Sequence, residues 1–111
     1  MSMKRLCIFI LLACISATFS YGKQLPKLTF SPHWLPQAQF AGYYVADKLG
    51  FYKEEGIDVE IKHPSASVNV VEMLKNGESE VISLFLTTAI SYKNKGYDLV
   101  NICQTSQNSA L

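Results

Sequence analysis

Aromatic, amide and hydroxyl side chains stand at positions where a chain of alternating strands and helices places a ligand site. Trp34 and Tyr43 can stack on a flat ring, and Gln39 and Gln104 can hydrogen-bond polar groups on its edge. Formal charges are scarce among these residues, which favours a neutral, ring-shaped or zwitterionic small molecule over a phosphate or a metal. The candidate ligand-binding residues are His33, Trp34, Gln39, Tyr43, Ser67, Thr87, Thr88, Gln104 and Ser106.

The residues indicate binding rather than catalysis. No Ser-His-Asp order, glycine-rich phosphate loop or paired acidic site stands out, and His33 and His63 lack a third ligand at metal spacing. We therefore expect no catalytic residue, no metal and no cofactor. Plainer interpretations stay open: Trp34 can pack a helix onto the sheet, and one of the adjacent Tyr43 and Tyr44 should face inward and the other outward.

The elements that must position these residues alternate regularly along the chain. Strands are predicted at 28–30, 57–62, 81–85 and 99–103, and helices at 36–49, 67–77 and 87–96. Right-handed crossovers then give an α/β fold with a parallel sheet and helices on both faces. Segments 31–39, 63–67, 86–88 and 104–108 leave the carboxyl ends of the strands. They should line one edge of the sheet, which is the usual ligand site of an open α/β fold.

Local patterns refine these elements. The spacing of Ala41, Val45, Leu49 and Tyr52 predicts one buried stripe on the first helix, closed by a glycine cap at residue 50. Ser67 is predicted to cap the second helix, and Thr87 or Thr88 the third. The second helix should bury Val70, Val71 and Leu74 and end at Gly77. The strict alternation in 57–62 is typical of a strand at a sheet edge, and the evenly apolar 81–85 fits a central strand.

Composition supports a single globular domain without a polyanionic partner. The chain has 111 residues, of which 49% are hydrophobic, and a formal net charge of +1, which gives no indication of nucleic-acid binding. Of the three cysteines, Cys7 and Cys14 precede the folded part, and Cys103 closes an apolar run. Internal disulfides are therefore not expected, and Cys103 should be a small buried hydrophobe.

Residues 1–22 are typical of a secretory signal peptide. Lys4 and Arg5 precede an apolar run that is too short to span a bilayer, and small and polar residues lead to Gly22. Cleavage after Gly22 would make the mature chain periplasmic or extracellular. In the alternative interpretation, the lipobox-like sequence before Cys14 directs a lipid to that cysteine and anchors the protein in the membrane.

The stretch HWLPQAQFAGYYVADKLGFYKEEGIDVEI, residues 33–61, resembles the opening of the periplasmic substrate-binding proteins of ABC importers. It is most similar to the branch that contains thiamine-pyrimidine precursor synthases and nitrate, sulfonate and taurine binders. LKNGESE, with Glu80 in place of the usual Asp, and the KGY at 95–97 keep step with the family. The resemblance covers residues 27–108.

The resemblance implies the first-lobe portion of a type II periplasmic-binding-protein fold. Residues 23–111 would be the N-terminal part of that lobe, truncated and without the second lobe. It also implies an extracytoplasmic binding component that works with an ABC permease and an ATPase. A thiamine pyrimidine precursor or a similar small molecule is the expected ligand.

Two other functions remain open. The related synthases consume one of their own histidines, but family spacing puts that histidine at Thr88. Their cysteine-rich motif is not present in residues 1–111, and its place in a longer chain would be beyond Leu111. The departure at Thr88 and the predicted leader favour binding over catalysis. The same module can also form the ligand-sensing domain of a membrane sensor protein.

Overall fold

The computed structural model describes residues 24–106, in which three parallel strands form one sheet. The strands are β1 (Lys27–Ser31), β2 (Asp58–Ile61) and β3 (Val81–Ile82), in the order β2-β1-β3. Lys27 lies opposite Asp58 and Phe30 opposite Ile61, while Phe30 and Ser31 lie opposite Val81 and Ile82. The parallel sheet and the edge position of β2 are as predicted.

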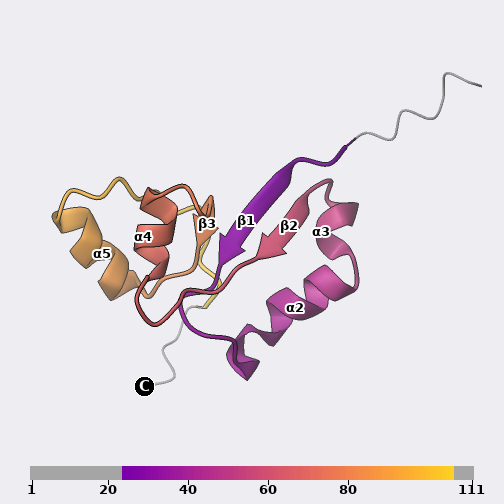
Figure 1. Cartoon of the computed structure of the whole chain (residues 1–111), viewed down its shortest axis with the longest axis horizontal. Coiled ribbons are helices and arrows are strands. Elements are labelled where there is room, and N and C mark those ends of the chain that lie inside the picture. The colour runs from indigo at the N-terminus through magenta and orange to yellow at the C-terminus, as the bar shows by residue number, and fades with distance from the viewer. Residues whose placement is uncertain (1–23, 107–111) are drawn as a thin grey trace, which may run out of the picture.

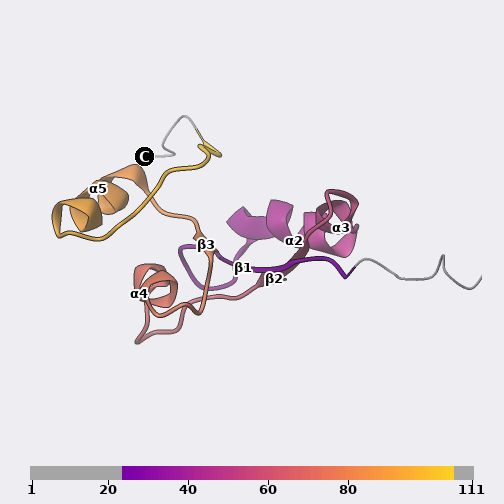
Figure 2. The same cartoon turned by 90° about the horizontal axis from the view of Figure 1, so that it is seen from above.

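Helices cover both faces of the sheet, as expected for the first-lobe portion of a type II binding protein. The short 3-10 helix η2 (Ala38–Phe40) leads into α2 (Ala41–Lys48) and α3 (Phe51–Glu54) (Figure 1), and α2 and α3 lie on one face of the sheet (Figure 2). The helix α4 (Val70–Lys75) lies on the other face, whereas α5 (Leu86–Asn94) is set away from the sheet (Figure 2). No helix within residues 24–106 combines the length and apolar character needed to cross a membrane.

The core is small and divided between the two faces. On the α4 side Val70, Val71 and Met73 are buried, and on the α2 side Phe40 is buried. Beneath α4 the hydroxyls of Ser31 and Ser79 hydrogen-bond to each other and are buried, which satisfies two polar groups that water cannot reach. The predicted burial of Val70 and Val71 is confirmed, while Leu74 is only half-buried.

The predicted fourth strand is wrong for the part of the chain that the structure describes. Residues 97–106 contain no strand, and Val100 and Ile102 are 79% and 76% exposed. A strand needs a neighbour that pairs its backbone groups, and an apolar run by itself does not supply one. For the same reason β3 stops at Ile82 and is an edge strand, so that β1 is central instead. Cys103 in this segment is exposed rather than buried.

The outward face of α2 also differs from the prediction. Val45 and Leu49 of the predicted stripe are 50% and 59% exposed, and Ala41 is exposed as well. The face toward the sheet carries Tyr43 and Tyr44 instead. Phe40, at the end of η2, is buried on this same side, so the aromatic side chains pack inward and the aliphatic stripe faces outward. Both tyrosines are half-buried, so the expectation of one inward and one outward ring is wrong.

The predicted side-chain caps of α4 and α5 are both wrong. The Oδ1 of Asn69 accepts hydrogen bonds from the backbone N–H groups of Val71 and Glu72 at 2.9 and 3.1 Å, so Asn69 rather than Ser67 caps α4. Thr87 and Thr88 lie inside α5, which begins after Phe85 without a side-chain cap. The glycine ends are confirmed: Gly50 and Gly77 have φ of 81° and 73°, the left-handed region that favours glycine.

The predicted leader, residues 1–22, and the predicted lipid site at Cys14 lie outside the described residues.

Candidate functional site

The candidate site is the edge of the sheet where the strands end, and the backbone positions its loops. Beyond the strands, the Lys62 N–H donates to the Phe30 carbonyl and the Ser83 N–H donates to the Ser31 carbonyl, both at 3.0 Å. These bonds carry the loops after β2 and β3 up to the end of β1. The loops after β2 and β3 therefore lie on either side of the segment that follows β1 (Figure 1).

A buried aromatic ring joins these loops. Phe40 is 3% exposed, and its ring centroid lies 5.1 Å from His33 and 5.9 Å from His63. Tyr43, one turn later, stacks at 6.3 Å from Phe40 and meets Phe30 of β1 edge-on at 4.7 Å. We call Phe40, Tyr43, Tyr44, His33 and His63 the edge aromatic cluster. These rings pack together at the edge of the sheet where the strands end.

His33 connects the loop after β1 to the loop after β3. Its backbone N–H donates to the Ser83 hydroxyl at 3.0 Å, and its Nδ1 lies 3.1 Å from the same oxygen. Its ring also meets Phe85 edge-on at 4.6 Å. Partial burial lowers the pKa of His33 below its ordinary value, because desolvation disfavours the charged imidazolium. At neutral pH the side chain is therefore an uncharged hydrogen-bonding group.

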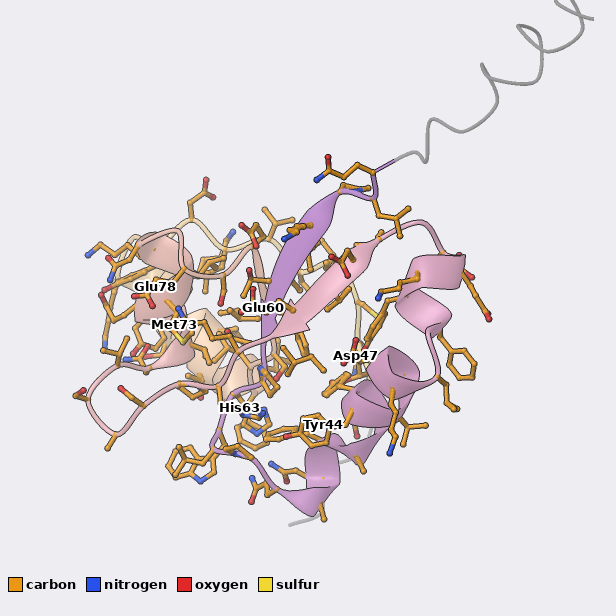
Figure 3. All side chains as sticks on the ribbon, turned by 45° about the vertical axis from the view of Figure 1, so that its right-hand side comes forward. Tyr44, Asp47, Glu60, His63, Met73 and Glu78 are labelled. Carbon is orange, nitrogen blue, oxygen red and sulfur yellow. The ribbon has the colours of Figure 1, made fainter. Side chains whose placement is uncertain are left out.

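His63 connects the loop after β2 to the loop after β1 and to α2. Its Nδ1 lies 2.7 Å from the carbonyl oxygen of Trp34, and its Nε2 lies 2.8 Å from the hydroxyl of Tyr44. A carbonyl only accepts, so Nδ1 carries the proton, and in the neutral ring Nε2 then accepts from the Tyr44 hydroxyl. Figure 3 shows the Tyr44 and His63 side chains next to each other, below the ends of the strands.

Two large aromatic side chains next to the edge aromatic cluster are exposed. Trp34, the residue after His33, is 60% exposed, and Phe85, in edge contact with the His33 ring, is 63% exposed. The packing interpretation of Trp34 is therefore wrong: its indole is not the core contact between helix and sheet. Exposed rings next to a packed aromatic cluster, with neutral polar groups around them, can bind a flat apolar or aromatic molecule by stacking.

The structure brings some of the predicted site residues together and leaves others apart. His33, Trp34 and Tyr43 gather at the edge aromatic cluster, and Gln39 is exposed in η2 directly before Phe40. Ser67 is in the turn before α4, with its hydroxyl 3.2 Å from that of Ser65.

The remaining predicted residues lie further along the chain. Thr87 and Thr88 are in the first turn of α5, just after Phe85. Gln104 donates from its amide to the Ser106 carbonyl at 3.1 Å. Figure 1 draws this last segment near the end of β3, but the turned view in Figure 2 sets it apart from the sheet.

Several residues of this edge were not among the predicted binding residues, although segment 63–67 was expected to line the edge. They are Phe40, Tyr44, His63, Ser83 and Phe85. A signal was present for Phe40, Tyr43 and Tyr44, which have the i, i+3, i+4 spacing of one helix face. The hydrogen-bond partners of the two histidines had no such signal, because His33 and Ser83 are 50 residues apart.

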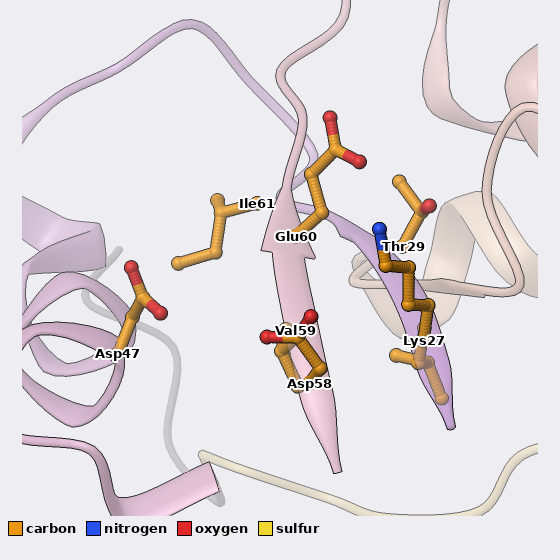
Figure 4. Close-up of a pocket in the computed structure, with 8 residues that line it drawn as sticks. Lys27, Thr29, Asp47, Asp58, Val59, Glu60 and Ile61 are labelled. Atoms are coloured by element: carbon orange, nitrogen blue, oxygen red, sulfur yellow. The ribbon is translucent and has the colours of Figure 1, made fainter. Parts of the chain in front are cut away.

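Two depressions lie elsewhere and have a different character. One, of about 290 Å³, borders β1 and β2 and collects carboxylates from the sheet and from α2 (Figure 4). The other, of about 460 Å³, lies between α4 and the residues after α5. Figure 4 labels residues around the first depression: Lys27, Thr29, Asp47, Asp58, Val59, Glu60 and Ile61.

Within residues 24–106 no group of three or more His, Cys, Asp or Glu side chains is arranged to hold a metal ion.

Comparison with known proteins identifies one family and a consistent set of relatives. The family described as NMT1/THI5 like matches residues 37–111. The formylaminopyrimidine-binding protein of Halalkalibacterium halodurans is 26% identical over 97 residues, which are 87% of this chain and 29% of that protein. No solved structure matches significantly.

Fungal relatives carry a different name. The 4-amino-5-hydroxymethyl-2-methylpyrimidine phosphate synthase THI11 of Saccharomyces cerevisiae is 24% identical over 76 residues, covering 68% of this chain and 22% of the yeast protein. The synthase of the same name from Candida albicans is 25% identical over 76 residues. The chain thus spans between 22% and 29% of the length of these relatives.

Proposed function

Because this chain belongs to the NMT1/THI5-like family, we propose that it binds a small molecule with a pyrimidine ring, as part of a solute-binding protein. The observation that carries the proposal is the exposed Trp34 indole, whose backbone is held over the edge aromatic cluster. The bacterial relative is named for binding a formylaminopyrimidine, and the proposed site would suit a ring of that class.

The chemistry of the edge supports a neutral, flat ligand. Trp34 and Phe85 supply rings for stacking, and His33, uncharged because burial lowers its pKa, supplies a polar edge. Gln39 adds an exposed amide nearby. None of these groups carries a formal charge at neutral pH, and they would not match the charge of a sulfonate or a nitrate.

Calorimetric titration with a formylaminopyrimidine tests the proposal. Replacing Trp34 by Ala removes a stacking contact worth about 0.5–1.5 kcal/mol beyond the burial of its surface. Together with the lost burial, binding by the full-length protein should weaken roughly tenfold or more. Phe51→Ala is the matched control, because Phe51 is an exposed aromatic on α3 and should leave affinity unchanged. Equal affinity of the wild type and Trp34→Ala would show that the ligand does not contact Trp34.

A synthase is the second candidate, favoured by the names of the fungal relatives. We rank binding first because Thr88 occupies the position that the resemblance assigns to the consumed histidine. Threonine has no ring nitrogen or ring carbon to contribute to a pyrimidine. Release of a phosphorylated pyrimidine by the purified protein would favour the synthase and contradict a purely binding function.

We further propose that the protein is exported and acts outside the cytoplasm with an ABC permease and ATPase, or alternatively as the ligand-sensing part of a membrane protein. The signal-peptide pattern of residues 1–22 supports export. Intact-mass measurement of secreted protein should give a chain that starts at Lys23. A diacylated Cys14 would support the anchored alternative, and a retained Met1 would contradict both. Permease and ATPase genes beside this one would favour transport over sensing.

A further inference from the structure

We propose that His63 is a positioning residue that fixes Trp34 at the binding edge, through a tyrosine–imidazole–carbonyl chain of hydrogen bonds. The Tyr44 hydroxyl donates to Nε2 of His63, and the His63 Nδ1–H donates to the Trp34 carbonyl. The expectation that Trp34 contacts a ligand rests on the function proposed above. The positioning of Trp34 by His63 is a property of the free protein and can be tested without a ligand.

The need for such a residue follows from the loop itself. Residues 32–37 have no regular secondary structure, and Trp34 and Leu35 are largely exposed, so side-chain burial contributes little to fixing them. A hydrogen bond at 2.7 Å to the Trp34 carbonyl restrains the backbone at the residue that carries the indole. A stacking platform is most effective when its orientation is set before the ligand arrives, because binding then does not have to order it.

His63 is itself firmly placed, which a positioning residue requires. Pro64 follows it and disfavours helical backbone at residue 63, so the chain leaves β2 extended. The imidazole is half-buried, its centroid is 5.9 Å from Phe40 and 5.8 Å from Tyr44, and both ring nitrogens have a partner. The tautomer is determined by these partners, since only a protonated Nδ1 can bond to a carbonyl.

Trp34 supplies its own reporter, because it is the single tryptophan of the chain. In the ligand-free protein, His63→Leu keeps an apolar side chain but removes both hydrogen bonds. It should lower the fluorescence anisotropy of Trp34 and increase its quenching by acrylamide. His63→Asn keeps an N–H near the position of Nδ1 and should restore much of the wild-type signal. Tyr44→Phe removes only the outer hydroxyl and should give a smaller change than His63→Leu.

Matched controls separate positioning from general loosening. Tyr97→Phe also removes a hydroxyl that bonds to a side chain, Glu72 at 3.0 Å, but it lies away from this edge and should leave the Trp34 signal unchanged. Far-UV circular dichroism should show that every variant keeps its helices. Unchanged anisotropy and quenching in a folded His63→Leu protein would overturn the proposal. So would equal effects of His63→Leu and His63→Asn.

Binding measurements then connect positioning to the proposed function. For a pyrimidine that the wild type binds, His63→Leu should weaken affinity by roughly two- to tenfold, the factor for ordering one side chain on binding. His63→Asn should recover most of that loss. If the wild type binds no such pyrimidine, the proposed ligand is wrong while the fluorescence result still decides the positioning role. Unaltered affinity in His63→Leu would contradict the functional part of the inference.

Discussion

His33 and His63 lie at the same edge of the sheet but have different contacts. His63 has a hydrogen-bond partner on each ring nitrogen and connects Trp34 to Tyr44. His33 contacts the Ser83 hydroxyl through Nδ1, and its ring makes edge-to-face contacts with Phe40 and Phe85. The partial burial of His33 lowers its pKa, since the protein offers less solvation to the imidazolium than water does. At the residue scale, this makes His33 a source of pH-dependent stability.

The sign of that dependence follows from proton linkage. In the unfolded chain His33 titrates near its ordinary value of 6.5, while the native state binds the same proton only at lower pH. As the pH falls below about 6.5, the unfolded state takes up the proton first, and the contribution of His33 to the free energy of unfolding declines until the lowered pKa is passed. Above that range the side chain is neutral in both states and contributes no pH dependence.

Urea unfolding of wild type and His33→Asn at about pH 7.5 and about pH 5.5 checks this prediction. The wild type should lose more stability on acidification than the variant, which has no imidazole at this position. Between about pH 7.5 and pH 8.5 the two should show the same dependence, which serves as the internal control. An identical loss in both proteins at the lower pH would contradict the prediction.

At the scale of elements, the rotation of α2 decides which residues form the site. Phe40, Tyr43 and Tyr44 face the sheet, while Val45 and Leu49 face outward. The aromatic face packs on Phe30 of β1 and reaches His63 after β2, so the helix supplies the aromatic side chains beneath the candidate site. With the aliphatic stripe inward instead, the hydroxyl of Tyr44 could not reach His63.

Two truncations distinguish these rotations. Phe40→Ala empties a buried position and should cost about 3–5 kcal/mol in the free energy of unfolding. Leu49→Ala removes an exposed side chain and should stay within about 0.5 kcal/mol of wild type. Chemical denaturation of the 111-residue chain measures both. A Leu49→Ala cost as large as that of a core substitution would indicate that the aliphatic stripe is the buried one.

At the scale of the whole molecule, the described residues divide into a packed body and a lightly attached end. The body contains the sheet with α2, α3 and α4, whereas α5 is set away from the sheet (Figure 2). Two side-chain hydrogen bonds join this end to α4: Asn69 to the Tyr92 hydroxyl at 3.3 Å, and Tyr97 to Glu72 at 3.0 Å. The latter raises the pKa of Tyr97, because its hydroxyl donates to a carboxylate.

Native-state hydrogen exchange should reveal this division. Amides of α5 should exchange through local opening and faster than those of β1, which is paired on both sides. The amides of α4, whose Val71 and Met73 are buried, are the control helix and should be protected nearly as well as β1. Equal protection of α4 and α5 would show that α5 is part of the packed body.

Local sequence alone determined the order of most elements, the helix ends at Gly50 and Gly77, and the edge position of 57–62. These features depend on residues close together in the chain: a glycine that adopts positive φ, or an alternation that marks one wet face. The family resemblance could also be recognised from sequence, because its motif is a contiguous stretch of residues.

Only the tertiary structure decided the rest, because it depends on partners distant in the chain. Helical spacing permitted two inward faces for α2, and contact with Phe30 and His63 selected the aromatic one. Residues 99–103 had the composition of a strand, yet no strand forms there in the described chain, since backbone pairing requires a neighbour. Trp34 could be recognised as a candidate binding residue from its residue type. Its exposure and the hydrogen bond between its carbonyl and His63 depend on the contact between two loops, because the two residues are 29 positions apart in sequence.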